Sequence, residues 1–351
     1  MGLKKSNFVE TRVLATNAGI NASYQIDLDK WHTDKNHKFL FTQSSGLLPI
    51  KLIFKSIKTI KKVDILHFNS LFYPPSLLLA LINVLFYKRK MVVSVRGELY
   101  PFALNTFRPR LKRIFIKIWK LILRKITIHC TVEKEEYYVK SVFGDSVKTV
   151  LLPNYIVRPE PIKKDENQEK EYILFLGRLH KIKGLENLFK ALQMSDNFMK
   201  SGLKLKLAGR GESVYEAKLK ALSKALGLHQ KIEFVGQVEG YEKEKLIANA
   251  YFLILPSFTE NFGNVVVESL MHAVPAITST GTPWSLLEKN KAGFWTENSV
   301  EALTKTIDKA CALSKEQYIQ YSKNAQKLAY AEYDIENNYQ NWVSFYKELV
   351  N

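Results

Sequence analysis

The stretch from Tyr172 to Leu185 reads YILFLGRLHKIKGL, and it decides the fold. Its apolar run predicts a buried strand, and Gly177 permits a tight turn directly after that strand. Arg178 and Lys183 then place two cations just beyond the strand end. Such a pair suits a diphosphate, which arginine can bind through two hydrogen bonds and lysine as a point charge. The alternative is an ordinary solvated loop between a strand and a helix.

Short apolar runs of the same kind recur on both sides of this stretch, and helical patterns such as Ser213–Leu226 and Lys243–Ala250 separate many of them. This alternation predicts an α/β protein with parallel sheets covered by helices. Ligands of such proteins gather at the carboxyl ends of the strands. The other runs lie at residues 12–15, 39–41, 65–68, 91–95, 126–130, 148–152, 204–208, 232–235, 252–255 and 275–278.

A polar segment divides the chain into two α/β domains of similar size. This segment, residues 157–170, carries two prolines and a cluster of charges, which is typical of a linker. We expect a first domain at residues 1–156, a second at 171–331, and a cleft between them. Residues 332–351 form a final helix that can pack back on the first domain.

Composition restricts the class of protein. The chain has 351 residues, of which 46% are hydrophobic and 25% charged, and this fits a globular protein and excludes collagen-like or disordered classes. The two cysteines, Cys130 and Cys311, have no Cys or His partner at metal-ligand spacing. A disulfide scaffold or a structural zinc site is therefore not expected. The cysteine content instead predicts a reducing compartment. The polar start, Met1–Glu10, predicts no secretory signal peptide.

Positive charge is concentrated in the first half of the chain. Residues 1–150 hold 26 Lys and Arg against 10 Asp and Glu, whereas residues 151–351 hold 26 against 24. The densest stretch, Arg108–Lys125, has the pattern of a cationic amphipathic helix. This helix can be a basic face exposed to solvent or a site that docks on a membrane surface. A nucleic-acid site is the third alternative, but the chain has no recognised nucleic-acid motif. The apolar run Leu77–Phe86 is too short to span a membrane and predicts a buried helix, with an interfacial role as the alternative.

A second motif, Glu260 to Glu268, reads ENFGNVVVE and places two glutamates eight positions apart. We expect Glu260 in a loop and Glu268 about one turn into the helix that follows. The backbone N–H groups from Phe262 to Val265 then lie at a helix N-terminus, which is a ready anion site, and Gly263 allows close backbone approach. The alternative is an N-cap loop with a solvated glutamate.

Two further turns follow predicted strands. The Gly209-Arg210-Gly211 turn either lets the backbone approach a nucleoside or is a simple strand-to-helix turn. The segment Ser279–Trp284 reads STGTPW and predicts a loop that closes the far side of the same cleft. Its tryptophan either stacks on a sugar or belongs to the core.

The order of these motifs resembles glycosyltransferase family 4, the group 1 glycosyltransferases, over nearly all of residues 60–350. In the first half, residues 64–70 (DILHFNS) and 94–99 (SVRGEL) look like the branch that acts in surface-polysaccharide assembly. The resemblance implies the GT-B fold, with two Rossmann-like domains, the nucleotide-sugar donor in the C-terminal one and the acceptor in the N-terminal one. It also implies retention at the anomeric carbon, and neither a metal nor another cofactor.

The resemblance also implies roles for the donor-side residues. Arg178 and Lys183 would hold the donor diphosphate, Glu260 would contact the donor sugar, and Glu268 would accept hydrogen bonds from the ribose hydroxyls. A leaving phosphate oxygen would take the acceptor proton, so that no side-chain base is needed. The other donor-binding positions are Gly177, Gly211, Asn261, Phe262, Gly263, Asn264 and Val265.

The acceptor side differs from the family pattern. Many relatives use a histidine in the first domain, where this chain reads Arg96-Gly97-Glu98. We expect Arg96 to bind the acceptor or a phosphate, with Glu98 and His67 as further acceptor-side candidates. The alternative for Arg96 is a structural salt bridge, and for His67 a satisfied histidine in the fold.

The start of the chain also differs. Family members usually open with a strand, a Gly-rich loop and a helix, but the first strand-like run here, Thr11–Asn17, looks like the strand that comes next. We therefore expect the first domain to lack that first strand and Gly-rich loop, and to have fewer strands than the second domain.

Together these features predict a retaining glycosyltransferase of surface polysaccharide (lipopolysaccharide or capsule) biosynthesis. It would be cytoplasmic and peripheral on the inner face of a membrane. The expected partners are a nucleotide-sugar donor, a glycan or lipid-diphosphate-linked acceptor and an anionic membrane surface, but no nucleic acid. The alternative is a catalytically weak or silent GT-B-fold protein that binds at the membrane surface. A nucleotide-sugar epimerase is disfavoured, because the combined motifs belong to transferases.

Overall fold

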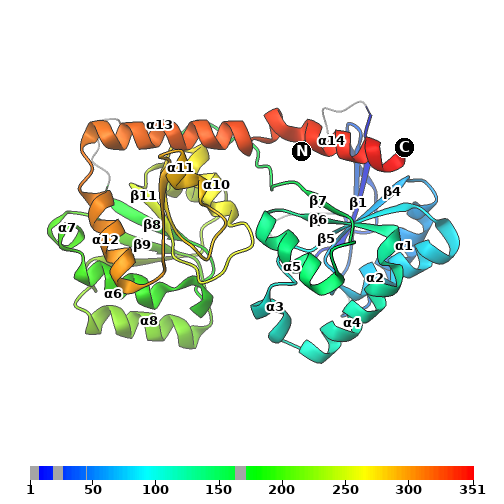
Figure 1. Ribbon diagram of the computed structural model, residues 1–351, viewed down its shortest axis with the longest axis horizontal. Helices are drawn as coiled ribbons and strands as arrows, with labels where there is room; N and C mark the ends of the chain where they lie inside the picture. Colours follow the sequence, from blue (N-terminus) through cyan, green and yellow to red (C-terminus); the bar gives the residue numbers. More distant parts are fainter. Residues whose placement is uncertain (1–7, 19–26, 45, 163–170) are drawn as a thin grey trace. The chain divides into compact units, whose positions relative to one another are not determined.

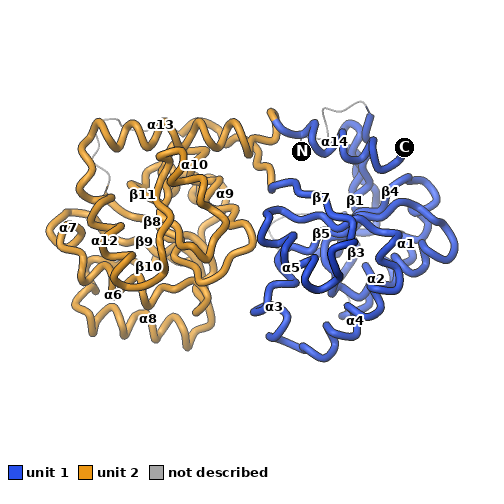
Figure 2. The backbone as a smooth tube through the Cα atoms, viewed as in Figure 1, with its two compact units in different colours: residues 1–153, 338–351 blue, residues 154–337 orange. Residues whose placement is uncertain are grey.

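The computed structural model describes residues 8–18, 27–44, 46–162 and 171–351. It divides into two compact units (Figure 2). Unit 1 consists of residues 1–153 and 338–351, and unit 2 of residues 154–337. Most of the last helix, α14 (Ile335–Val350), therefore belongs to unit 1. Part of the predicted linker, residues 163–170, lies outside the described residues, as do residues 1–7 of the polar start.

Unit 2 is built on one six-stranded parallel sheet with the strand order β10-β9-β8-β11-β12-β13, of which Figure 1 labels β8, β9 and β11. Its middle strands are almost wholly buried and apolar, as expected for a parallel sheet covered by helices on both faces. The strands are β8 (Tyr172–Leu176), β9 (Lys204–Ala208), β10 (Ile232–Gly236), β11 (Phe252–Leu255), β12 (Ala276–Ser279) and β13 (Gly293–Thr296). The helices are α6 (Leu185–Met194), α7 (Asp196–Lys200), α8 (Ser213–Ala225), α9 (Gly240–Ala248), α10 (Asn264–Met271), α11 (Leu286–Lys289), α12 (Val300–Cys311) and α13 (Lys315–Glu332), with a short 3₁₀ turn η4 (Lys181–Lys183) after β8.

Unit 1 contains two separate sheets. One has the order β1-β3-β2, in which β1 and β3 are parallel and β2 is antiparallel, and the other is the parallel sheet β4-β5-β6-β7. The strands are β1 (Thr11–Thr16), β2 (His32–Asp34), β3 (His37–Thr42), β4 (Ile65–Asn69), β5 (Lys90–Ser94), β6 (Ile126–Cys130) and β7 (Thr149–Leu151). The helices, besides α14, are α1 (Ile50–Ile60), α2 (Pro74–Ile82), the π-helical η2 (Asn83–Tyr87), α3 (Pro101–Asn105), α4 (Pro109–Ile122), the 3₁₀ turn η3 (Leu123–Lys125) and α5 (Glu133–Phe143).

The expectation that the first half has fewer strands than the second is wrong. The described residues of unit 1 form a three-stranded and a four-stranded sheet, against one six-stranded sheet in unit 2. Two strands were not predicted from the sequence: β2, which is only three residues long and polar, and β13, which begins at a glycine. Neither has the apolar run on which the strand predictions relied.

The helix predicted from the apolar run Leu77–Phe86 is buried only in its first part. Leu77 and Leu79 of α2 are buried, whereas Leu85 and Phe86 of η2 are about 70% exposed, at 69% and 73%. The predicted cationic helix is confirmed as α4, which continues into η3. Among the described helices, none is both long and apolar enough to cross a membrane.

A chain of hydrogen bonds runs through unit 1 from the last helix to the strand ends. The Tyr346 hydroxyl lies 2.7 Å from Nδ1 of His67, whose Nε2 lies 2.7 Å from Oγ of Ser94. The same Oγ lies 2.7 Å from Nδ1 of His129, and Nε2 of His129 lies 2.8 Å from the carbonyl oxygen of Leu152. The chain therefore ties α14 to β4, β5 and β6.

One carbonyl group determines the direction of this whole chain. The Leu152 oxygen can only accept, so Nε2 of His129 carries a proton and its Nδ1 accepts from Ser94. Ser94 then accepts from Nε2 of His67, and the Tyr346 hydroxyl donates to Nδ1 of His67. Both imidazoles are neutral in this arrangement. Burial lowers the pKa of His67 to about 3 and that of His129 to about 4.

We expect unit 1 to lose stability when the pH falls below about 6.5. In the unfolded chain both imidazoles have the ordinary pKa of about 6.5, so the unfolded state takes up protons first. The contribution of His67 and His129 is present above that pH and is lost as the pH falls toward 4. The expected slope is on the order of 1 kcal/mol per pH unit for each imidazole. Amide hydrogen exchange of β4 and β6 between pH 7 and 5 measures it.

A paired substitution tests the same chain at constant pH. Ser94→Ala removes the donor to His129 and should lower the free energy of unfolding by about 1–3 kcal/mol. Ser146→Ala, at an exposed serine of the same unit, is the matched control. Equal effects of the two variants, or a unit 1 that is as stable at pH 5 as at pH 7, would contradict the hydrogen-bond chain.

Candidate functional site

The strand order of unit 2 places the predicted motifs at one edge of its sheet. From β8 the chain proceeds outward through β9 to β10, and it then returns to β11 and proceeds in the other direction through β12 to β13. The carboxyl ends of β8 and β11 therefore flank the point where the order reverses, which is where ligands bind in open α/β sheets. The segment 177–184 follows β8, and the segment 256–263 follows β11.

An ion pair lies at this reversal point. Nζ of Lys183 is hydrogen-bonded to Oε2 of Glu260, and the two side chains are only 17% and 20% exposed. The hydroxyl of Ser257 lies 3.4 Å from the same carboxylate oxygen. The structure thus joins two candidate residues that are 77 positions apart in the sequence. Glu260 lies in a loop, as expected.

The loops that carry this pair are held by backbone contacts. The N–H of Phe258 donates to the carbonyl of Ile182 at 2.8 Å, and the N–H of Glu260 donates to the carbonyl of Gly281 at 3.1 Å. A Cβ at Gly184 would lie 2.3 Å from the carbonyl oxygen of Pro256, and this glycine has φ of +67°. Only glycine allows the two loops to approach so closely.

The turns after β8 and β9 are packed just as tightly. The N–H of Gly177 donates to the carbonyl of Ala208 at 2.9 Å. A Cβ at Gly209 would lie 1.9 Å from the carbonyl oxygen of Gly177, and one at Gly211 would lie 2.2 Å from that of Leu179. Loop packing therefore requires Gly209 and Gly211. That the backbone of this turn also approaches a nucleoside stays a prediction.

The helix that follows Glu260 begins as expected. Gly263, with φ of +78°, caps α10, and Glu268 lies one turn into that helix. Nζ of Lys243 on α9 lies 2.9 Å from Oε1 of Glu268, which is 22% exposed. The Oδ1 of Asn264 accepts from Nδ2 of Asn154 at 2.9 Å. The N-terminus of α10, with its first backbone N–H groups, thus directly follows the loop that carries the Glu260 carboxylate.

The tryptophan of the STGTPW turn belongs to the core. Trp284 is 1% exposed, and its indole N–H donates to the carbonyl of Phe262 at 2.6 Å. Its ring packs against Phe262 and Tyr333, with centroids 5.5 and 5.2 Å apart. Of the two roles considered for it, stacking on a sugar is therefore wrong, because no face of the ring is accessible. Its part is to fix the loop that precedes α10.

Arg178 differs from Lys183 in its surroundings. The Arg178 side chain is exposed and forms no ion pair with another described residue. His180, which the sequence analysis did not single out, accepts a hydrogen bond from the Ile182 N–H through Nδ1, at 3.2 Å. Burial lowers the pKa of His180, and the positive charge of Arg178 lowers it further. The segment between the two cations is therefore ordered by an imidazole.

The acceptor-side candidates lie in unit 1, and each of them interacts with other residues of that unit, Arg96 with the charge of Glu135. Glu98 accepts from the Ser70 hydroxyl at 2.5 Å and from the Leu71 N–H at 2.6 Å, and burial raises its pKa. His67 is held through both ring nitrogens in the chain described above. Arg96 follows β5 in a left-handed conformation, with φ of +50°. Of the three, only Arg96 has an exposed side chain.

Two residues that order these sites were not predicted from the sequence. In unit 1, Glu135 accepts from the N–H of Gly97 at 2.5 Å and from the N–H of Thr131 at 2.7 Å. In unit 2, the Asn298 side chain donates to the carbonyl of Pro256 beside Gly184. Both act on backbone groups of neighbouring loops, and no local sequence pattern marks such a role. Among the described residues, no group of three His, Cys, Asp or Glu could hold a metal ion.

Comparisons with known proteins agree with this geometry. Residues 158–328 match the family model of glycosyl transferases group 1. The chain is 28% identical over 249 residues to a Campylobacter jejuni α-1,4-N-acetylgalactosaminyltransferase that acts on a diNAcBac-PP-undecaprenol-linked glycan, and the match covers 67% of this chain and 65% of that protein. It is 30% identical over 182 residues to an uncharacterized glycosyltransferase of Methanocaldococcus jannaschii, covering 51% and 45%. The matches thus span less than two thirds of both relatives.

A solved structure extends the likeness to most of the chain. HepE of Anabaena, in complex with UDP and glucose, superposes with a TM-score of 0.72 at 18% sequence identity, covering 89% of this chain and 86% of HepE. At this identity the superposition is evidence for the fold alone. The motifs at the sheet edge of unit 2 and the family match over the same residues place residues 158–328 in the group 1 glycosyltransferases, glycosyltransferase family 4, and the superposition shows the GT-B fold over most of the chain.

Proposed function

We propose that this chain transfers a sugar from a nucleotide-sugar donor to a glycan or lipid-linked acceptor in surface polysaccharide biosynthesis, with retention of configuration. The observation that carries the proposal is the Lys183–Glu260 pair at the reversal point of the unit 2 sheet. It supplies a cation for a diphosphate and a carboxylate for a sugar at the same place. The family uses nucleotide-sugar donors and needs no metal cofactor.

Each donor group has a counterpart at this edge. Arg178 is exposed and free to bind the diphosphate through two hydrogen bonds, and Lys183 adds a second cation. The N-terminus of α10, capped by Gly263, favours negative charge through its free N–H groups. Glu268, farther along α10, is the acceptor for ribose hydroxyls. Fixed cations of this kind can stabilise the charge on the leaving nucleoside diphosphate.

The proposed reaction needs no separate base. The acceptor hydroxyl oxygen forms a bond with the anomeric carbon on the face from which the diphosphate departs, as the bond from that carbon to the phosphate oxygen breaks. The hydroxyl proton passes to a leaving phosphate oxygen, and the electron pair of the broken bond stays on the diphosphate. Arg178 and Lys183 stabilise that charge, and Glu260 orients the donor sugar.

The ion pair changes partners when the donor binds. Without a ligand, Glu260 neutralises Lys183 in a partly buried position. A diphosphate carries more negative charge than one carboxylate, and we propose that it draws Lys183 away from Glu260. The released carboxylate is then available to the sugar hydroxyls. Binding of the diphosphate and orientation of the sugar are coupled in this way.

The exposed surface of α4 supports our proposal that the protein binds to the inner face of a membrane. Leu111, Ile114 and Leu121 are 42%, 53% and 82% exposed on a helix whose other face buries Trp119 and Ile122. A purely solvated basic face would not need apolar side chains among its cations. The cations on the same exposed side are Arg110, Arg113, Lys117, Lys120, Arg124 and Lys125. Mixed apolar and cationic side chains are typical of helices that lie in an anionic membrane interface.

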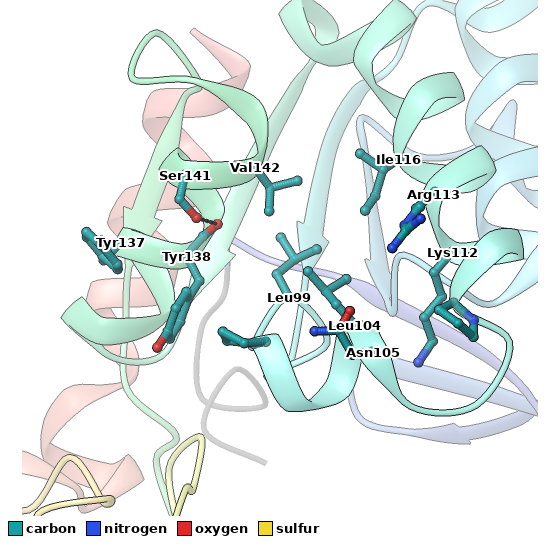
Figure 3. Close-up of a pocket in the computed structure, with 12 residues that line it drawn as sticks. Leu99, Leu104, Asn105, Lys112, Arg113, Ile116, Tyr137, Tyr138, Ser141 and Val142 are labelled. Atoms are coloured by element: carbon teal, nitrogen blue, oxygen red, sulfur yellow. Dashed lines mark hydrogen bonds between the residues drawn. The ribbon is translucent and has the colours of Figure 1, made fainter.

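A hollow beside α4 adds a place for the polar part of an acceptor. It has a volume of about 310 Å³ and lies between α3, α4 and α5, with Lys112 and Arg113 on the α4 side and Tyr138 on the α5 side (Figure 3). Lys112 is already hydrogen-bonded to the carbonyls of Ala103 and Thr106, at 2.6 and 3.0 Å. Arg113 is therefore the group of this hollow that remains for a phosphate of a lipid-linked acceptor.

A catalytically silent binding protein is the second candidate. It is favoured by unit 1, whose described strands form two sheets instead of one. We propose, as the sequence suggested, that the described residues of unit 1 do not include the first strand and Gly-rich loop of the family, and that Arg96 is the main cation of unit 1 toward the donor or acceptor. Transfer assays with a panel of UDP-, GDP- and dTDP-sugars separate the two candidates.

Substitutions of the ion pair should have opposite effects on nucleotide binding. Lys183→Ala removes a charge-assisted hydrogen bond worth about 1.5–3 kcal/mol and should weaken nucleoside diphosphate binding roughly 10- to 100-fold. Glu260→Gln removes the competing carboxylate and should leave that affinity unchanged or raise it, while transfer is lost. Calorimetry with the nucleoside diphosphate measures both. Lys200→Ala, at an exposed lysine of the same unit, is the control. Unchanged affinity in Lys183→Ala would refute the assignment.

Transfer should not depend on a divalent metal, because Arg178 and Lys183 already supply two cations to the diphosphate. We expect most of the activity to remain in excess EDTA. A complete loss that Mg²⁺ or Mn²⁺ restores would show that the diphosphate is held by a metal instead.

Membrane binding should depend on the charge of α4. Replacing Arg113, Lys117 and Lys120 by glutamine should weaken binding to anionic vesicles roughly 100-fold, at ~1 kcal/mol for each cation. Replacing Lys200, Lys224 and Lys305 of unit 2 removes the same charge and is the matched control. Co-sedimentation should fall with salt, because the Debye length shrinks from ~10 Å at 0.1 M to ~3 Å at 1 M. Equal binding to neutral and anionic vesicles would rule out this attachment.

A further inference from the structure

A cluster of three charged side chains, separate from the Lys183–Glu260 pair, lies where α9 and α10 contact each other in unit 2 (Figure 2). Nζ of Lys243 on α9 lies 2.9 Å from Oε1 of Glu268 on α10 and 3.7 Å from Oε1 of Glu244. The side chains of Lys243, Glu268 and Glu244 are 26%, 22% and 32% exposed. Lys243 is therefore a partly buried cation between two carboxylates.

Glu244 is held in place by a buried histidine. Nε2 of His272 lies 2.7 Å from Oε2 of Glu244, and this hydrogen bond lowers the pKa of Glu244, so the carboxylate is ionised at neutral pH. The other oxygen, Oε1, is the one that lies near Lys243. Glu244 can therefore bind Lys243 and His272 together. Lys243 thus has a second carboxylate within reach, besides the one with which it is paired.

The pairing of Glu268 bears on how strongly the proposed donor site depends on ribose hydroxyls. A site that hydrogen-bonds a ligand hydroxyl rejects the analogue without it most strongly when the polar group of the protein is then left without a partner. Glu268 is not left in this state, because Lys243 is paired with it when no ligand is bound. The ribose hydroxyls replace an existing partner of the carboxylate, so the free energy that they contribute is small.

We infer that Lys243 is a specificity-determining residue that makes the donor site tolerant of nucleotides whose ribose lacks a hydroxyl. The inference rests on the proposed function, in which Glu268 binds the ribose. When a ribonucleoside diphosphate binds, its hydroxyls donate to Glu268 and the Lys243 ammonium moves to Glu244. When a deoxyribonucleoside diphosphate binds, Lys243 stays with Glu268.

Both complexes leave the three charges of the cluster with partners. The donors that this site accepts therefore include sugars linked to a 2′-deoxyribonucleoside diphosphate, as in dTDP-sugars, besides those linked to a ribonucleoside diphosphate. Lys243 acts through Glu268 and not on the reacting atoms, so its effect is on the choice of nucleotide.

A purely structural role is the alternative for Lys243. The ion pair joins α9 to α10, and its loss can loosen the contact between the two helices. Such loosening would weaken the binding of ribonucleotides and deoxyribonucleotides alike, because it acts on the site as a whole. The ratio of the two affinities, measured on the same variant, therefore distinguishes the two roles.

Calorimetry of the full chain with UDP and with 2′,3′-dideoxy-UDP measures this ratio. The dideoxy nucleotide lacks both hydroxyls that Glu268 could bind, but it keeps the base and the diphosphate. We expect the unmodified chain to bind UDP less than about tenfold more tightly than dideoxy-UDP. GDP and its dideoxy form replace this pair of nucleotides if GDP binds more tightly than UDP.

Substitutions of Lys243 should change the ratio in a defined direction. Lys243→Met keeps the aliphatic chain but leaves Glu268 without its cation, so the preference for UDP should rise at least about tenfold, a difference of roughly 1.4 kcal/mol. Lys243→Arg keeps the charge and should keep the low ratio of the unmodified chain. Lys245→Met, at an exposed lysine of the same helix, is the matched control and should change neither affinity.

Glu244→Gln tests the exchange of partners from the other side. Glutamine still accepts the hydrogen bond from His272 but no longer neutralises Lys243. The ammonium then loses a carboxylate when UDP displaces it from Glu268, so UDP should bind roughly two- to fivefold more weakly. The affinity for dideoxy-UDP should not change, because Lys243 stays with Glu268 in that complex.

Two results would overturn the inference and leave the proposed function intact. One is a preference for UDP above about tenfold in the unmodified chain, and the other is the same ratio in the unmodified chain and in Lys243→Met. A chain that binds neither UDP nor GDP nor their dideoxy forms would instead refute the proposed donor site, and this inference with it.

Discussion

Everything at the candidate site depends on how closely three strand-end loops approach one another. A Cβ at Gly209 would meet the backbone of Gly177 at 1.9 Å, and one at Gly184 would meet that of Pro256 at 2.3 Å. Backbone atoms packed in this way cannot shift independently. The loops after β8, β9 and β11 therefore form one rigid edge, and the Lys183–Glu260 pair is held on it. A site that must position a reacting sugar benefits from such rigidity, because small displacements lower the rate steeply.

The sequence predicted the parts of this edge that follow from local pattern. The apolar runs of β8 and β11, the loop position of Glu260 and the place of Glu268 one turn into α10 all depend on neighbouring residues. The sequence could not predict which strands are adjacent, since β8 pairs with β11 across almost 80 positions. Trp284 was ambiguous for the same reason: its burial depends on Tyr333, far along the chain. Asn298 acts through a backbone carbonyl, which has no sequence signature.

The strands of the two units are held together in different ways. In unit 2 they form one continuous sheet from β10 to β13. In unit 1 the described strands form two separate sheets, with β1 and β4 at their ends. His67, Ser94 and His129 link successive strands of the four-stranded sheet through hydrogen bonds whose direction is set by one carbonyl. These side-chain hydrogen bonds add to the backbone ladders between β4, β5 and β6.

In the proposed donor site, the ion pair favours some anions over others. Lys183 is partly buried and already paired, so a monovalent anion must displace Glu260 before it gains that charge. Exchanging one carboxylate for another anion of the same charge yields little free energy. A diphosphate yields more, because it carries additional charge and can contact Arg178 and the N-terminus of α10 together. Under the proposed function, the carboxylate of Glu260 therefore favours a diphosphate over a monovalent anion, and the released carboxylate is then available to the sugar that follows the diphosphate.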